Sequence, residues 1–359
     1  MVIIIVDRAG EHTGAAVPYN EIVKPMHGGN LMIYERSILV TLVILVDLIA
    51  MPAPRRRRGR PWVYPDRLFL KALVIMIVRR LTKIHILLAV LDQPTDEMQQ
   101  LRALLTENGR YPSRRTFERR LKAIPATLPA QIGCLGRCLV GLILPWQECA
   151  RAAAIDSTIV RSCGGVWHRK DREAGKVPHT SIDTQAHWTK SGWHGWVYGW
   201  KLHLVTTAAG VWIPLAARLT PANAADNEEA PALIRELPTE LRFLLGDVHY
   251  LDPDLETLCQ ERGIILVTSH NTKGHPYPHT DPGVEVRRIL HKVRSLAIEN
   301  FNEQFKSIFE GHASVPTRGL CATARFVLGA VFVYQLTLLY QYMADGDLRL
   351  GLKAFIKAA

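Results

Sequence analysis

The pattern of apolar positions divides the chain into a helical first part and a mixed second part. Apolar residues fill positions 38–50 almost without interruption and recur at helical spacing in several later segments. The predicted helices of the first part are residues 38–50, 68–91, the basic segment that follows Ser113, and 132–143. The run at 38–50 is shorter than the roughly 20 residues of a membrane span. It also contains Asp47, so the sequence favours a buried core helix over a transmembrane one.

After Pro145 the pattern changes to short apolar runs of the kind found in strands. Residues 201–206 and 211–219 alternate like paired strands around the turn at Ala209 and Gly210. The five predicted strands are 152–160, 201–206, 211–219, 242–248 and 264–268, and the predicted helices are 226–237, 252–262, 286–309 and 322–343. Three strands followed by alternating helices and strands predict an α/β domain, with a five-stranded mixed sheet flanked by helices.

The length of 359 residues exceeds that of one typical domain, so we predict several parts. These are an N-terminal extension with an apolar helix (1–54), an all-α basic region (55–145), the mixed domain (146–320) with a Trp-rich insertion (161–200), and a C-terminal helical segment (321–359).

Composition narrows the class of protein. An apolar fraction of 48% and a charged fraction of 21% are those of a globular protein, which excludes a disordered chain, a collagen-like repeat and a coiled-coil rod. The six cysteines are scattered, and no secretory signal pattern opens the sequence. We therefore expect a reducing, cytoplasmic location.

Positive charge is concentrated in residues 55–122, where 17 Lys and Arg face 6 Asp and Glu, an excess equal to the +11 of the whole chain. A localised basic stretch is typical of a protein that binds a polyanion such as DNA. The candidate DNA contacts are Arg55, Arg56, Arg57, Arg58 and Arg60 in a Pro-containing linker, and Arg114, Arg115 and Arg119, with Arg120 alongside, on a short helix capped by Ser113. The alternatives are a solvated basic face and a basic hinge.

Five of the eight tryptophans lie between residues 161 and 200. Aromatic side chains next to Lys190, His194 and Lys201 are suited to stack on bases while the cations contact phosphates. The alternative is a small hydrophobic cluster that packs on the edge of the sheet.

Three carboxylates stand out in the second part. Asp156 lies inside an apolar predicted strand, Asp247 follows another strand after Gly246, and Glu299 lies on the predicted helix 286–309. Taken singly, each has an ordinary structural role available, such as a turn cap or an ion pair with Lys292 or Lys306. Together they form an oxygen-rich set suited to Mg²⁺ or Mn²⁺. His249, close to Asp247, is expected to contact phosphate or to pack rather than to bind metal.

These residues occur within a series of short motifs. In chain order, the motifs are Ala-Ile-Asp156-Ser-Thr, Gly-Trp-Lys201-Leu-His203-Leu, Thr-Pro-Ala-Asn-Ala-Ala-Asp226-Asn, Gly-Asp247-Val-His-Tyr, and Arg294 with Glu299 and Lys306. The series resembles the DDE transposases of bacterial insertion sequences over about residues 55–345. The helix departs from the family pattern, because Lys292 and Ser295 occupy the positions of its Tyr and Arg and Arg294 is one residue away.

The resemblance implies a ribonuclease H-like catalytic domain with a metal-binding triad of Asp156, Asp247 and Glu299. It implies phosphate contacts from Lys201 and Lys306, and cleavage and strand transfer at the ends of an insertion element. The implied partners are double-stranded DNA, both element ends and target, and a second copy of the chain, with no membrane, in a bacterial cytoplasm at the nucleoid. Two alternatives remain open: a nuclease on the same fold without strand transfer, and a DNA-binding remnant with an inactive site.

Overall fold

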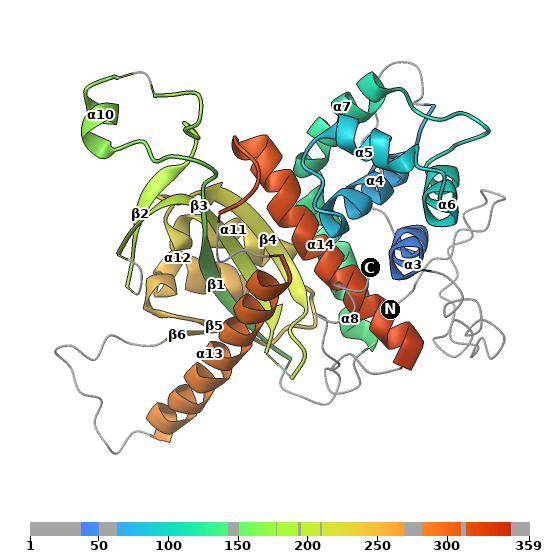
Figure 1. Ribbon diagram of the computed structural model, residues 1–359. Coiled ribbons are helices and arrows are strands. Elements are labelled where there is room, and N and C mark those ends of the chain that lie inside the picture. Colours follow the sequence, from blue (N-terminus) through green and yellow to red (C-terminus); the bar gives the residue numbers. More distant parts are fainter. Residues whose placement is uncertain are drawn as a thin grey trace. The chain divides into compact units, whose positions relative to one another are not determined.

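The computed structural model describes residues 37–49, 63–142, 151–176, 178–192, 195–208, 210–268, 282–309 and 314–345. The chain divides into two compact units, one formed by the residues up to Ile124 with those from Leu336, the other by Pro125–Gln335 (Figure 1). The predicted four-part division has boundaries at other positions and stays a prediction.

The first unit is helical. Its helices in the described residues before Ile124 are α3 (Ile38–Leu45), α4 (Asp66–Val78), α5 (Ile84–Leu91), α6 (Asp96–Leu104) and α7 (Arg114–Ala123). The first part of the apolar run predicted as a helix over 38–50 forms α3, whose side chains are mostly buried, as predicted. The helix ends at Leu45, earlier than predicted, and residues 46–49 form a turn. Ser113 caps α7, with its hydroxyl accepting the Thr116 amide at 3.3 Å. This confirms the predicted start of the basic helix.

The single helix predicted over 68–91 is wrong, because the structure has two helices there. α4 ends at Val78, and α5 begins at Ile84. Arg80 between them has φ +55°, the left-handed conformation, which a continuing right-handed helix excludes. The apolar pattern resumes after the break, so periodicity alone did not reveal it.

Buried cations connect the helices of this unit. Lys71 on α4 lies 2.7 Å from Asp47, just beyond α3, and its side chain is 11% exposed. Arg120 on α7 pairs with Asp66 at the start of α4, and its guanidinium lies 4.5 Å from the centre of the Phe69 ring. The apolar part of the same α4–α7 contact is the edge-to-face packing of Phe69 on Phe117.

The second unit is built on a six-stranded mixed sheet with the strand order β2-β3-β1-β5-β6, in which β4 also pairs with β3. The strands are β1 (Ala152–Arg161), β2 (His187–Ser191), β3 (Gly195–Thr207), β4 (Pro214–Pro221), β5 (Phe243–Gly246) and β6 (Ile265–Thr268). β3 is antiparallel to β1, β2 and β4, while β1, β5 and β6 run parallel. All five predicted strands are present, and the sixth, β2, comes from the Trp-rich insertion.

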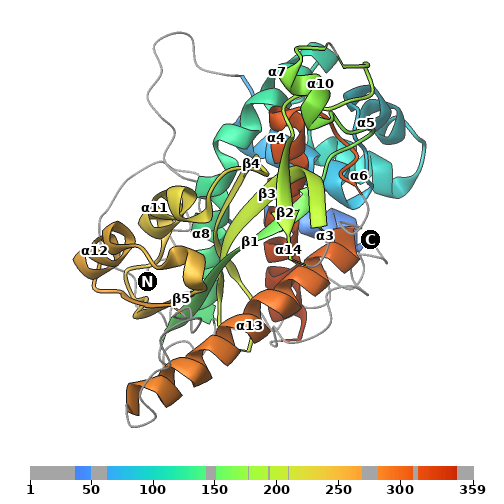
Figure 2. The same cartoon turned by 90° about the vertical axis from the view of Figure 1, so that its left-hand side faces the viewer.

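Helices cover both faces of the sheet. The helices of this unit are α8 (Leu128–Leu142), α10 (Arg169–Glu173), α11 (Asp226–Glu236), α12 (Pro253–Glu261), α13 (Pro282–Phe309) and the part of α14 (Leu320–Asp345) that belongs to it. The short helix α10 belongs to the Trp-rich insertion and lies away from the sheet (Figure 1). Figure 2 shows α11 and α12 on one side of the sheet and α13 on the other. α13 packs through its buried residues Ala297, Ile298, Phe301 and Phe305.

Among the described residues, α14 is long and apolar enough to cross a membrane, and so is the bent pair Arg114–Ala126 and Leu128–Leu142. However, 83% of the most apolar window of α14 is buried within the protein, which is typical of a core helix. Gln335 on α14 donates hydrogen bonds to the backbone oxygens of Ile132 on α8 and Pro214 on β4, at 2.8 and 2.7 Å.

Candidate active site

Asp156 lies in the middle of β1, flanked by the antiparallel β3 and the parallel β5. One carboxylate oxygen accepts the Ser157 amide at 2.7 Å. Burial raises the pKa of Asp156 to about 6, although the positive charge of Arg294 and the Ser157 amide oppose the shift, and the negative charge of Asp247 adds to it. A carboxylate in this position favours a cation beside it.

Asp247 comes directly after β5 and caps the short 3-10 turn Val248–Tyr250. Its carboxylate accepts the His249 amide at 2.9 Å and lies 3.1 Å from His249 Nδ1. These contacts with Asp247 raise the pKa of His249 above its ordinary value. His249 is therefore a partner of the predicted metal ligand.

The register of the sheet brings the two aspartates together. Ala154 on β1 pairs with Leu245 on the parallel strand β5, so the positions two residues further along, Asp156 and Asp247, are level with each other. Close packing supports this end of β5, because a Cβ on Gly246 would lie 2.9 Å from the Cβ of Tyr250. The sequence predicted this pair from two strand positions 91 residues apart.

Arg294 approaches the same site from α13. Its Nη1 donates to the second carboxylate oxygen of Asp156 at 3.0 Å, and the exposed fraction of the arginine side chain is 12%. The sequence placed Arg294 one residue away from the family position and left its role open. The structure gives it a direct contact with the predicted site.

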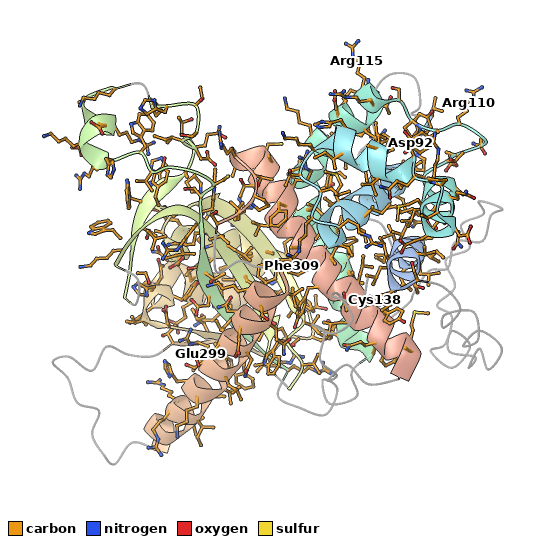
Figure 3. The ribbon with its side chains drawn as sticks, viewed as in Figure 1. Asp92, Arg110, Arg115, Cys138, Glu299 and Phe309 are labelled. Carbon is orange, nitrogen blue, oxygen red and sulfur yellow. The ribbon has the colours of Figure 1, made fainter. Side chains whose placement is uncertain are left out.

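Glu299 has a different position. It lies on α13 (Figure 3), five residues after Arg294, and is exposed. Five residues correspond to about 140° around an α-helix. The carboxylate is thus on another side of α13 from the face that packs on the sheet, and its part in the triad stays a prediction.

Asp226, the first residue of α11, is a further acidic group of the site. It lies 3.3 Å from Lys201 Nζ and 3.3 Å from His203 Nδ1, both on β3. Burial raises the pKa of Asp226, but the nearby His203 ring and Lys201 charge outweigh it and lower the pKa to about 2. Sequence reasoning used Asp226 as a helix start and as part of one of the family-like motifs, but gave it no role in the site. The signal available was the i, i+2 spacing of Lys201 and His203, which places both on one face of a strand.

The predicted phosphate contact Lys201 is already engaged. Its ammonium donates to the Ala224 backbone oxygen at 2.8 Å and pairs with Asp226, and its side chain is 11% exposed. Lys201 therefore holds the start of α11 against β3, and its phosphate contact stays a prediction. Lys306 lies on α13, partly buried, and burial lowers its pKa.

The chemistry of the two aspartates suits a divalent ion, since they are neighbouring hard oxygen donors and burial raises the pKa of Asp156 despite its contact with Arg294. Within the part of the chain that the structure describes, no group of three or more His, Cys, Asp or Glu side chains is arranged to hold a metal. The described contacts thus assemble a pair of carboxylates.

The basic residues of the N-terminal unit fall into three groups. Arg55–Arg58 and Arg60 lie outside the described residues. Arg114, Arg115 and Arg119 are exposed on α7, with Arg114 paired to Glu118 at 2.8 Å. Figure 3 shows Arg115 extending outward from this unit. Arg120, expected alongside them, is instead buried in its pair with Asp66.

The tryptophans of the Trp-rich insertion include both packed and exposed side chains, the two arrangements considered from its sequence. Trp200 is fully buried, and the indole of Trp188 donates to the Trp167 backbone oxygen at 2.7 Å. In contrast, Trp196 is 64% exposed and stands opposite Lys190 in the β2–β3 pairing. Trp193 and His194 lie outside the described residues. Trp200 thus belongs to the core, Trp167 and Trp188 pack together half-buried, and Trp196 lies at the surface.

Comparisons with known proteins complete the description. Residues 147–314 match the family described as "Transposase DDE domain", and this segment contains Asp156, Asp247 and Glu299. A search of curated proteins found no match. A solved structure described as "Crystal structure of a pre-cleavage Mos1 transpososome" aligns with 11% identity over 92% of this chain and 98% of that chain, but its TM-score of 0.21 is too low to carry an argument.

The family match agrees with the sheet described above, so the predicted ribonuclease H-like class is confirmed. Over residues 147–314, this chain is therefore similar to the transposase DDE domain family.

Proposed function

We propose that this chain is an active transposase, which cleaves the ends of an insertion element and joins them to target DNA in a metal-dependent reaction. The observation that carries the proposal is the pair Asp156 and Asp247, level on neighbouring parallel strands inside the DDE domain. Two adjacent carboxylates in an apolar sheet destabilise the folded protein, and their presence at such a position favours a catalytic role.

In this proposal Asp156 and Asp247 hold Mg²⁺ or Mn²⁺, and Glu299 completes the site. A bound ion supplies Lewis acidity to activate the attacking oxygen and stabilise the leaving oxygen at phosphorus. The protein supplies the positions. The β1–β5 register sets the spacing of the two aspartates, and His249 orients the Asp247 carboxylate. Lys306, on the same helix as Glu299, contacts DNA phosphate.

The DNA partner is proposed from charge. Arg55–Arg58, Arg60 and the exposed arginines of α7 bind the element ends, because Lys and Arg clusters neutralise phosphates irrespective of base sequence. Joining two ends requires two copies of the chain on the DNA, so we propose a homodimer in the complex. Because the proposed substrate is double-stranded DNA, both element ends and target, we propose a cytoplasmic location at the nucleoid.

The proposal is tested by incubating the purified full chain with labelled DNA that carries the ends of its element, a target plasmid and Mg²⁺ or Mn²⁺. Metal-dependent nicks with a 3′-hydroxyl, followed by joined products, support a transposase. Nicks without joined products indicate a nuclease on the same fold. Binding of the ends without any cleavage indicates an inactive remnant, and contradicts the proposal.

A further inference from the structure

Both oxygens of the Asp156 carboxylate already have a donor within the protein. Oδ1 accepts the Ser157 amide at 2.7 Å, and Oδ2 accepts Arg294 Nη1 at 3.0 Å. The amide is part of the same strand and keeps its place. The guanidinium is on a long side chain from a different element, α13, and is the donor that a competing cation displaces.

The contact between Arg294 and Asp156 is shielded from water. The exposed fractions of the two side chains are 12% and 26%. Charges in such surroundings interact more strongly than an exposed pair, because the effective dielectric constant is lower than that of water. The pair is therefore a stronger competitor for a cation than a surface salt bridge would be.

Packing of α13 fixes the base of the Arg294 side chain. Ala297, Ile298 and Phe301, which follow within two turns, are buried against the sheet, so Arg294 starts on the same sheet-facing side. Arg294 Nε is buried without a hydrogen-bond partner among the described residues. The guanidinium is thus incompletely satisfied, and attraction to the carboxylate, rather than a full set of hydrogen bonds, keeps it at the site.

We propose that Arg294 is an internal counter-ion, which neutralises Asp156 in the metal-free protein and has to leave its carboxylate oxygen before a divalent ion binds there. The inference rests on the proposed function, since it takes Asp156 to be a metal ligand. It assigns Arg294 a role in setting metal affinity before any DNA is present.

The test measures binding of Mn²⁺ alone to the full chain by titration calorimetry, with thermal unfolding in parallel. Arg294→Gln removes the competing charge and keeps a polar side chain. We expect Mn²⁺ to bind this variant about tenfold more tightly than the wild type, since a charge-assisted hydrogen bond no longer has to be broken. Without metal the variant should unfold at a lower temperature, and Mn²⁺ should raise its unfolding temperature by more than that of the wild type.

Arg287→Gln is the matched control, because Arg287 lies two turns earlier on α13, is exposed and undergoes the same change of charge. It should bind Mn²⁺ like the wild type. The double variant Asp156→Asn, Arg294→Gln should lose the tighter binding. Arg294→Lys keeps the charge but loses the planar fork of donors. We expect its affinity to lie between those of wild type and Arg294→Gln, which keeps the test available if the glutamine variant does not fold.

Equal or weaker Mn²⁺ binding by Arg294→Gln, with normal binding by the wild type, would overturn the counter-ion role and leave the proposed function standing. If Asp156→Asn binds Mn²⁺ as the wild type does, or if neither protein binds it, then Asp156 is not a metal ligand, and the proposed function fails together with the inference.

Discussion

At the scale of single residues, the aspartates of the site differ in what surrounds them. Asp156 is buried beside a single arginine, whereas Asp226 has both Lys201 and His203 within 3.3 Å. For Asp156 the effect of burial is larger and raises its pKa to about 6. For Asp226 the neighbouring side chains have the larger effect and lower its pKa to about 2. Asp226 is consequently a stabilising carboxylate, and Asp156 is one that needs a cation.

The low pKa of Asp226 predicts a pH-dependent contribution to stability. The folded pKa of about 2 lies below the ordinary aspartate pKa of 3.8, so the stabilisation is present above pH 3.8 and is lost as the pH falls toward 2. Asp226→Asn should therefore lower the free energy of unfolding by about 2 kcal/mol at pH 7, and the difference from wild type should shrink below pH 4. Urea unfolding at several pH values measures it. A difference that stays constant down to pH 2.5 would contradict the assignment.

Sequence reasoning found the residues that break a local pattern. Asp156 and Asp247 were identifiable because an acid inside or at the end of an apolar strand is unusual. The contact of Arg294 with Asp156 was not, because the two residues are 138 positions apart and only the packing of α13 brings them together. The same holds for Arg120, whose buried pair with Asp66 spans 54 positions.

At the scale of elements, all five predicted strands exist, and β1, β5 and β6 have nearly their predicted bounds. In contrast, β3 begins six residues before its predicted start, at Gly195, and β4 begins three residues after its predicted start, at Pro214. The missed strand β2, with the sequence His-Trp-Thr-Lys-Ser, has no apolar alternation and forms because β3 extends beyond β4 to residue 195 and leaves an edge for it. The register of β2 depends on tertiary contacts, and the break between α4 and α5 depends on backbone conformation. Neither can be predicted from the periodicity of apolar residues.

The packing of α8 on β4 gives a prediction at this scale. A Cβ on Gly136 would lie 2.4 Å from the Pro214 backbone oxygen, so Gly136→Ala should force the helix from the strand and lower the free energy of unfolding by about 1–3 kcal/mol. Gly133→Ala, one turn earlier, is the control, since its nearest contacts are at 3.4 Å and alanine favours the helix. Chemical denaturation compares the two variants. Equal stabilities would mean that α8 is not held this closely.

At the scale of the whole molecule, charge separates the basic segment 55–122 from the remainder of the chain, which carries no net excess. The DDE domain contains the carboxylates that we propose bind a metal ion, and the N-terminal region contains the arginines that we propose bind DNA. This distribution of charge is the one expected of a protein that binds DNA with one part and cleaves it with another.

That division predicts a salt dependence for DNA binding. Replacing Arg55–Arg58 with Ala should weaken binding to all DNA sequences, and the slope of log K against log salt should become shallower by roughly 3.6 if the four arginines cover four phosphates. Arg169→Ala is a suitable control, because Arg169 is exposed but already paired with Glu173. Filter binding over a range of salt concentrations gives the slopes. An unchanged slope would indicate that Arg55–Arg58 form a basic hinge and do not contact DNA.

We propose above all that Asp156, Asp247 and Glu299 form one metal-dependent catalytic site. Its most direct measurement is cleavage of labelled element ends by Asp156→Asn, Asp247→Asn and Glu299→Gln in Mg²⁺, with end binding measured on the same preparations. We predict that each variant loses cleavage by on the order of 10³-fold, about 4 kcal/mol of transition-state stabilisation, while binding stays near wild type. Near-normal cleavage by either aspartate variant would contradict the account, and near-normal cleavage by Glu299→Gln alone would remove Glu299 from the site.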